Sequence, residues 1–310
     1  MLDAFSIFGQ ILKKIMATLK IDSLCKTYPN GVKALNNVSL EIENGMFGLL
    51  GPNGAGKSSL MRTLASLQEA DSGSAFLGDI DILNQPKEIR KVLGYLPQEF
   101  GVYPKITAYQ LLDHIAILKG ISNGKERKEL VSYLLQKVNL YEQKNKSVKG
   151  FSGGMKQRVG IAQALIGNPK LVIVDEPTAG LDPGERNRFH NLLADVGEEV
   201  IVILSTHIVA DVTELCTKMA IMNAGELVFH GKPNEVIAEL KGKVWQKIVE
   251  RNELEEVKKN YQVISDKMVG GKPLVHVYGE TNPGSGFESV EPGLEDVFFV
   301  KINEPTSLEV

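Results

Sequence analysis

The sequence has few cysteines, no long hydrophobic run and no large excess of charge of either sign. Cys25 and Cys216 are its two cysteines, which leaves no disulfide framework and indicates a reducing compartment. No apolar stretch approaches the roughly 18–20 residues that are needed to cross a bilayer. The formal net charge of −3 argues against a nucleic-acid footprint. These absences exclude a disulfide-stabilised domain and a polytopic membrane protein.

A glycine-rich segment carries the first positive signal. Gly51-Pro-Asn-Gly-Ala-Gly-Lys-Ser58 fits the phosphate-binding pattern of Gly, four residues and Gly-Lys-Ser/Thr. Met46–Leu50 before it is expected to form a buried strand. Ser58–Leu67 after it is expected to form a helix with Leu60, Met61, Leu64 and Leu67 on one face. Backbone N–H groups of such a loop turn toward a triphosphate, and the helix N-terminus adds positive charge. The segment therefore predicts ATP or GTP binding.

The residues expected to contact the nucleotide in this loop are Gly51, Pro52, Asn53, Gly54, Ala55, Gly56, Lys57, Ser58 and Ser59. Lys57 is expected to reach the β- and γ-phosphates, and Ser58 to hold Mg²⁺.

An apolar run ends in two carboxylates further along the chain. Leu171–Val174 leads directly into Asp175 and Glu176. A strand that ends in this way places Asp175 at the edge of a parallel sheet, beside the phosphate loop, where it can support the metal ion. Glu176, one residue further on, is expected to orient the attacking water.

Five further segments stand in a specific order around these two. They are Tyr28 in Lys-Thr-Tyr-Pro-Asn, Gln98 in Tyr-Leu-Pro-Gln-Glu, Phe151-Ser-Gly-Gly-Met155, Ala179-Gly-Leu-Asp182, and His207 after the strand Val200–Leu204. The ordered set resembles the nucleotide-binding subunits of ABC-type ATPases over roughly residues 18–233. Each segment alone also fits an ordinary turn, strand end or surface side chain.

The resemblance implies a role for each segment. Tyr28 stacks on adenine, a contact of roughly 1–3 kcal/mol, and Gln98 is a switch residue that senses the γ-phosphate and the Mg²⁺. Ala179–Asp182 meets the partner subunit, and His207 hydrogen-bonds the γ-phosphate. The expected catalytic residues are then Glu176, His207, Gln98 and Lys57, and the expected metal ligands are Ser58, Gln98 and Asp175.

The segment Phe151–Met155, here called the signature segment, also has a physical interpretation of its own. Ser152 can cap a helix that begins near Met155, which leaves its hydroxyl and the N–H groups of Gly153 and Gly154 free to bind an anion. One chain already has a phosphate loop, so a second anion site needs a second phosphate. The resemblance implies that this phosphate is the γ-phosphate held by the opposite subunit, so that two ATP molecules close a dimer.

The signature segment departs from the commonest pattern of the family. Phe151 stands where leucine is usual, and Met155 stands where glutamine is usual. This variant resembles the branch of exporters for drugs, sodium, lipids or polysaccharides. Ile208, where many importers carry aspartate, and the segment 293–299, which resembles a short terminal helix of that branch, point the same way.

The chain divides into regions of different character. Residues 1–17 are an extension, interpreted either as a membrane-surface helix or as sequence before a true start at Met16. Residues 18–233 form the expected ATPase domain. A helical insert of about residues 100–152 has Thr107 as its first N-cap and Leu111, Leu112, Ile115 and Leu118 as its buried face. In the family this insert touches the membrane subunit, with 102–107 near the contact.

The motifs stop after about residue 233. Residues 234–310 are expected to form a small α/β appendage with strands at 245–249, 261–265 and 274–277, a helix near 252–259 and a loop at 282–286. The fold class is therefore α/β: a P-loop NTPase of ABC type with an antiparallel β subdomain, a helical insert and this appendage.

The sequence as a whole favours an ATP-hydrolysing subunit of an ABC exporter. It is expected to work as a dimer with a second copy or a homologous subunit, at the cytoplasmic face of the membrane, under a separate polytopic permease. A soluble ABC-type ATPase that remodels ribosomes or DNA is the alternative. It is disfavoured because the chain has one such core and because about 95 residues between phosphate loop and signature segment leave no room for long coiled coils.

Overall fold

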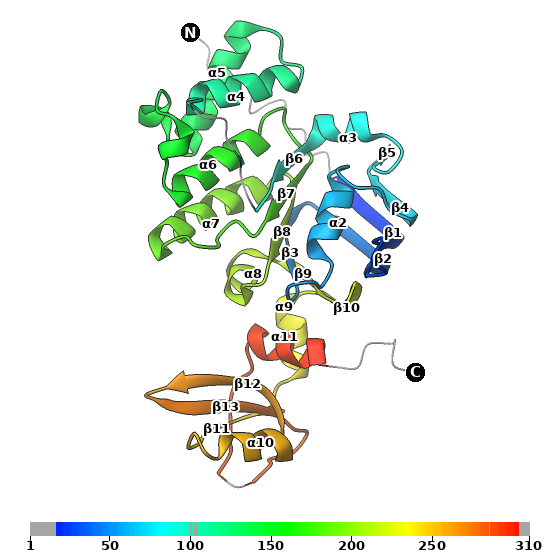
Figure 1. Cartoon of the computed structure of the whole chain (residues 1–310), viewed down its shortest axis with the longest axis vertical. Helices are drawn as coiled ribbons and strands as arrows, with labels where there is room; N and C mark the ends of the chain where they lie inside the picture. The colour runs from blue at the N-terminus through cyan, green and yellow to red at the C-terminus, as the bar shows by residue number, and fades with distance from the viewer. Residues whose placement is uncertain (1–16, 99–100, 102–104, 285, 304–310) are drawn as a thin grey trace.

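A computed structural model describes residues 17–98, 101, 105–284 and 286–303. Residues 1–16 of the expected extension and residues 102–104 of the expected permease contact at 102–107 therefore lie outside the described residues. The described chain contains three sheets, and helices cover them (Figure 1).

The central sheet has six strands in the order β10-β9-β3-β8-β7-β6. Their bounds are β3 Gly45–Leu50, β6 Leu93–Leu96, β7 Leu171–Asp175, β8 Ile201–Thr206, β9 Lys218–Asn223 and β10 Glu226–Gly231. All adjacent pairs are parallel except β9 and β10. Every residue of β7 and β8 is buried, which is the burial expected of a parallel strand covered on both faces.

An antiparallel sheet lies beside the central sheet and has the strand order β2-β1-β4-β5. Its strands are β1 Thr18–Thr27, β2 Lys33–Glu43, β4 Ser72–Leu77 and β5 Ile80–Asp81, and the helices near it are α2 Lys57–Leu64 and α3 Pro86–Val92. Apolar residues of β1, β2 and α2 form one core with Phe47, Ile173 and Ile203. The antiparallel sheet and α2 therefore cover one face of the central sheet.

Helices cover the opposite face of the central sheet. They are α4 Ala108–Leu118, α5 Gly124–Lys137, α6 Gly153–Ala164, α7 Pro183–Gly197 and α8 Val209–Leu215, with short 3-10 turns η1 Tyr141–Gln143 and η2 Val148–Gly150. Their apolar residues form a second core with Val172, Val174 and Leu204. Alternate residues of β7 and β8 therefore point into different cores, as the pleat of a strand requires.

The ends of two predicted helices differ from the sequence expectation. Thr107 caps α4 in a capping box with Gln110, as predicted. However, Leu118 is 70% exposed and Leu67 is 60% exposed, so the expectation that both lie on buried faces is wrong. Helix α2 ends at Leu64, and Ser66 has a φ of 55°. The turn at Ser66 directs Leu67 away from the core that Leu60, Met61 and Leu64 enter.

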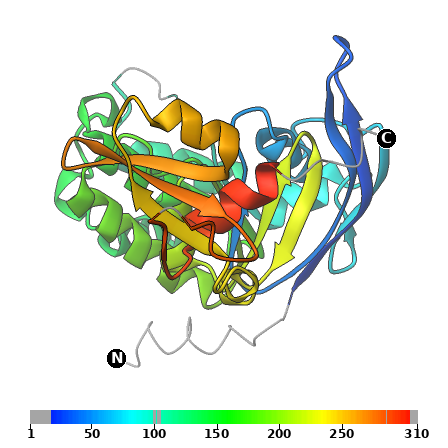
Figure 2. The same cartoon turned by 90° about the horizontal axis from the view of Figure 1, so that it is seen from below.

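The C-terminal appendage has a sheet of its own with the order β12-β13-β11-β14. The elements after β10 are α9 Pro233–Glu239, β11 Val244–Ile248, α10 Leu254–Asn260, β12 Gln262–Val269, β13 Lys272–Tyr278, β14 Glu288–Ser289 and α11 Leu294–Asn303. Helix α11 lies between the appendage sheet and the ATPase core (Figures 1 and 2). It contacts α8, β9 and β10 of the core as well as α9 and β12.

Cys216 and Cys25 are expected to differ strongly in reactivity. Cys216 is buried, and burial together with the charge of Asp211 raises the pKa of its thiol to about 12. Cys25 is half-buried. Because the thiolate is the reacting form, a disulfide reagent at pH 8 should modify one thiol per folded chain and two in guanidinium chloride. Loss of the fast phase in Cys25→Ser would identify it, and two equally fast thiols in the folded protein would contradict the assignment.

Candidate functional site

Backbone atoms of neighbouring segments pack closely against the underside of the glycine-rich loop between β3 and α2. Gly56 is the N-cap of α2 with a φ of 105°, a conformation that favours glycine. A Cβ atom at Gly56 would lie 2.3 Å from the carbonyl oxygen of Ala34, and one at Gly51 would lie 2.6 Å from that of Met222. Side chains at these positions are therefore excluded, while Asn53 and Gly54 are exposed at the top of the loop.

The ammonium of Lys57 lies under the loop and donates to it. Its Nζ is 2.7 Å from the carbonyl oxygen of Gly51, 3.2 Å from that of Pro52 and 3.9 Å from Oε1 of Glu176. Burial lowers the pKa of Lys57, and the nearby charges of Glu176 and Asp175 oppose that shift. The charge of Lys57 is thus held next to the space where the loop can place a phosphate.

The two carboxylates after the apolar run leave β7 in different directions. Asp175 is the last residue of the strand, and its Oδ1 is buried without a hydrogen-bond partner among the described residues. Glu176 has a φ of 48°, and its N–H donates to the carbonyl oxygen of Ser205 on β8. A non-glycine residue at positive φ is uncommon, and here it turns the Glu176 side chain away from the strand direction and toward His207.

Glu176 and His207 contact each other directly. Oε2 of Glu176 lies 2.5 Å from Nδ1 of His207, and the histidine side chain is half-exposed. The contact arises because β7 and β8 are parallel neighbours with Asp175 opposite Ser205, so that both residues follow the same edge of the sheet. The motifs predicted that Glu176 orients the attacking water and that His207 bonds the γ-phosphate, but they did not predict this mutual hydrogen bond.

Two of the expected metal ligands, Ser58 and Gln98, have exposed side chains. Ser58 is exposed in the first turn of α2, and Gln98 is exposed two residues after β6. The register of β6 with β7 pairs Leu96 with Val174, so Gln98 lies at the same sheet edge as Asp175. Within the described residues no three His, Cys, Asp or Glu side chains cluster as metal ligands. A carboxylate with one unbonded buried oxygen, together with a serine and an amide, suits Mg²⁺, which keeps water and phosphate ligands.

Tyr28 is anchored next to the phosphate loop. Its hydroxyl lies 3.0 Å from Oγ of Ser59 and donates to Oε1 of Gln68 at 2.8 Å. Ser59 is buried in α2, directly after Ser58. These bonds fix the tyrosine ring relative to the loop, and they also give Ser59 a role in positioning the ring.

The signature segment forms the N-terminus of α6. Ser152 is the N-cap and its hydroxyl accepts from the N–H of Met155 at 3.2 Å. The helix begins at Gly153 rather than near Met155, so Gly153 and Gly154 occupy its first turn, where N–H groups lack helical partners. Helices α6 and α2 pack on opposite faces of the central sheet.

Comparisons with known proteins agree with this arrangement. Residues 35–179 match the family described as ABC transporter. An uncharacterized ABC transporter ATP-binding protein, YxlF of Bacillus subtilis, is 39% identical over 70% of this chain and 72% of its own length. The linearmycin resistance ATP-binding protein LnrL of the same organism is 34% identical over 72% of each chain.

A solved structure has the same fold over the ATPase core. It is the dimeric post-hydrolysis state of the ATP-binding cassette MJ0796 bound to ADP and Pi, with a TM-score of 0.64 and 27% identity over 69% of this chain and 98% of that one. The predicted fold class, a P-loop NTPase of ABC type, is confirmed. None of the helices in the described part of the chain is long and apolar enough to cross a membrane. The chain belongs to the ATP-binding proteins of the ABC transporter family, whose members in general bind and hydrolyse ATP.

Proposed function

We propose that this chain is the ATP-hydrolysing subunit of an ABC exporter and drives a separate polytopic permease from the cytoplasmic face of the membrane. The observation that carries the proposal is the convergence of Lys57, Asp175, Glu176 and His207 at one edge of the central sheet, beside the glycine-rich loop. One buried carboxylate oxygen has no hydrogen-bond partner among the described residues, a lysine is held under the loop, and a glutamate and a histidine are joined. Together these features suit phosphoryl transfer to water.

Each side chain has a defined task in that reaction. When ATP enters, Lys57 exchanges the carbonyl oxygens of Gly51 and Pro52 for phosphate oxygens. Glu176 accepts the proton of the attacking water through a carboxylate held in place by His207. His207 then donates a hydrogen bond to the γ-phosphate. Catalysis is positioning and charge stabilisation without a covalent intermediate.

Three of the residues at this edge of the sheet would hold a magnesium ion. Asp175, Ser58 and Gln98 would hold Mg²⁺ together with the phosphates, and the ion would neutralise charge on the β- and γ-phosphates. The buried Oδ1 of Asp175, which has no partner among the described residues, is the feature that fits this ion.

The signature segment supports dimer closure by ATP. Ser152, Gly153 and Gly154 present the N-terminus of α6, a site for an anion. Because α6 and α2 belong to different faces of the sheet, the phosphate that α6 binds comes from the nucleotide on a second subunit. The dimeric cassettes among the solved structures support this arrangement.

The export direction is supported by the residues that depart from the commonest pattern. Phe151 is buried and Met155 packs against the helical core, so both serve packing of α6 while Ser152 and the glycines keep the anion site. Ile208 and the terminal helix α11 also resemble the exporter branch of the family. The relative named as a linearmycin resistance ATP-binding protein also supports the export direction.

Tyr28 is expected to stack on the adenine base. Tyr28→Ala should weaken ATP binding by roughly 5- to 150-fold, the equivalent of a stacking contact of about 1–3 kcal/mol. Tyr28→Phe keeps the ring and loses the bonds to Ser59 and Gln68, so it should stay within about threefold of wild type. Titration with a fluorescent ATP analogue measures both, and an equal loss in the two variants would assign the effect to the hydroxyl instead.

The permease can be identified by capturing the closed dimer on it. Tagged Glu176→Gln protein with Mg-ATP should recover a polytopic membrane protein in stoichiometric amount from solubilised native membranes, and Lys57→Ala protein should not. Vesicles that contain the permease identified in this way together with the wild-type ATPase should then move substrate away from the side of the membrane that carries the ATPase. Recovery of ribosomes or a soluble complex with no membrane protein would favour the remodelling ATPase. Movement of substrate toward the side that carries the ATPase would overturn the export direction.

A further inference from the structure

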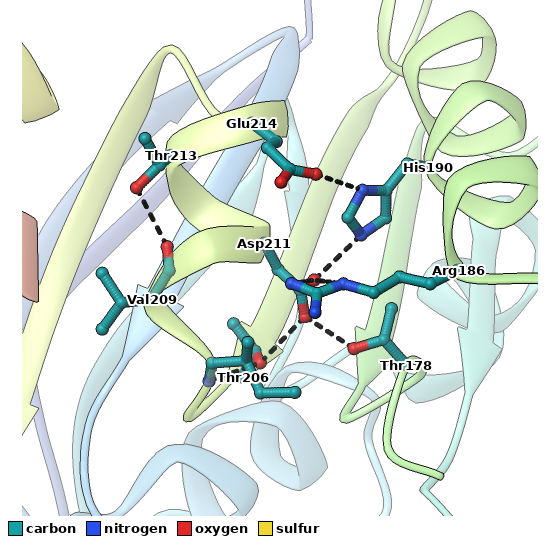
Figure 3. A network of polar contacts seen from close by, with 9 residues as sticks. Thr178, Arg186, His190, Thr206, Val209, Asp211, Thr213 and Glu214 are labelled. Atoms are coloured by element: carbon teal, nitrogen blue, oxygen red, sulfur yellow. Dashed lines mark hydrogen bonds and ion pairs between the residues drawn. The ribbon is translucent and has the colours of Figure 1, made fainter. Parts of the chain in front are cut away.

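A buried carboxylate lies behind the proposed catalytic residues. Asp211 of α8 is fully buried and accepts from four side chains (Figure 3). Its Oδ2 accepts from Oγ1 of Thr178 at 2.6 Å and from Oγ1 of Thr206 at 3.4 Å. Its Oδ1 accepts from Arg186 at 2.8 Å and faces Nε2 of His190 at 2.9 Å. The sequence patterns gave none of these residues a role.

The two hydroxyl groups belong to the segments that carry Glu176 and His207. Thr178 follows Glu176 by two residues and is buried. Thr206 directly precedes His207, and its hydroxyl also accepts from the N–H of Ile208 at 2.9 Å. That bond closes a turn around His207. One carboxylate oxygen thus joins the two segments behind the 2.5 Å contact between Glu176 and His207.

The other oxygen of Asp211 is directed at α7. Arg186 and His190 are one helical turn apart on that helix, and the second ring nitrogen of His190 lies 2.9 Å from Oε2 of Glu214. Helix α7 follows Asp182, its N-cap. Thr178 and α7 therefore stand on either side of the segment Ala179–Asp182, which the family resemblance places against the partner subunit.

We propose that Asp211 is a positioning residue for ATP hydrolysis, one that fixes the Glu176 and His207 segments relative to each other and to the segment Ala179–Asp182. This inference rests on the proposed function. A carboxylate that served only to join α7 to α8 would need Arg186 and His190 alone. The second oxygen instead receives two hydroxyls whose neighbours in the chain are the proposed base and histidine.

The test changes Thr178 rather than Asp211. Removing Asp211 leaves Arg186 without its buried counter-charge and takes one of its two hydrogen-bond partners from His190, which destabilises the fold strongly. Thr178→Val keeps the shape and every ion pair and removes one bond. Thr178→Ser keeps the hydroxyl. Thr213→Val is the matched control, because among the described residues its hydroxyl donates only within α8, to the carbonyl oxygen of Val209.

We expect Thr178→Val to lower kcat for ATP about tenfold, with KM and the Kd for ATP within twofold of wild type and Tm within a few degrees. Small displacements of reacting groups have effects of this size. Thr178→Ser and Thr213→Val should keep the wild-type kcat. A kcat within twofold of wild type in Thr178→Val, or an equal loss in Thr178→Ser, would overturn the inference while the wild type remains an active ATPase.

Two further results would also count against it. If Thr178→Val lowered kcat, the affinity for ATP and Tm together, the role of Asp211 would be merely structural. A wild-type protein that binds ATP without turning it over would overturn the proposed function and this inference with it.

Discussion

Glu176→Gln should lower ATP turnover by about 100- to 10,000-fold while ATP binding is preserved. The amide has the size of the carboxylate, so the neighbouring Lys57 and His207 keep a partner at 3.9 Å and 2.5 Å, respectively. It cannot accept a proton from water, however. If ATP closes the dimer and hydrolysis reopens it, the variant should accumulate as a dimer with Mg-ATP bound.

Two measurements separate binding from turnover in this variant. Phosphate release gives kcat, and size-exclusion chromatography with light scattering in Mg-ATP and in Mg-ADP gives the mass of the species. Glu198→Gln, at the exposed C-terminal end of α7, is the control and should behave as wild type. Unchanged hydrolysis in Glu176→Gln would remove Glu176 as the base, and a monomer in Mg-ATP would argue against closure by ATP.

Loss of Lys57 should have its largest effect on binding. Lys57→Ala should weaken ATP binding by about 10- to 150-fold, because a hydrogen bond to a charged group contributes about 1.5–3 kcal/mol. The substitution also removes the donor to the carbonyl oxygens of Gly51 and Pro52. The loop therefore loses both its internal support and the cation that faces the phosphates.

Lys119 provides a matched control for that experiment. Its ammonium also donates to two backbone carbonyl oxygens, those of Arg90 and Leu93, and burial lowers its pKa as it does for Lys57. Lys119→Ala should lower the free energy of unfolding without changing the Kd for ATP measured by calorimetry. Equal losses of ATP affinity in the two variants would mean that general destabilisation, and not the phosphate contact, explains the Lys57 result.

The sequence predicted the parts of this molecule that depend on local patterns. Periodicity and end signals predicted the phosphate loop, the buried strands β7 and β8, the capping residues Thr107 and Ser152, and strands β11, β12 and β13 with helix α10 of the appendage, but not α9 or β14. The roles of Glu176, His207 and the nucleotide contacts remain predictions. Their common place at one sheet edge follows from the parallel pairing of strands whose ends carry them.

Other features depend on tertiary packing, which a pattern in one segment does not contain. Leu67 and Leu118 both fit helical periodicity. However, the chain turns before Leu67, and Leu118 is the exposed last residue of α4. From the sequence pattern alone, Asp211 is one polar residue on a short helix. It acquires four partners only because α7, α8 and the ends of β7 and β8 meet behind the site.

Helix α11 has a consequence for the order in which the chain becomes folded during synthesis. It buries Leu294, Val297 and Phe298 and packs on α8, β9 and β10, which were made some 60–90 residues earlier. Asn223 at the end of β9 also donates to the carbonyl oxygen of Ile302. Until residues 294–303 leave the ribosome, this face of the ATPase core has no cover, and a nascent chain halted at 290 would present an apolar surface to chaperones.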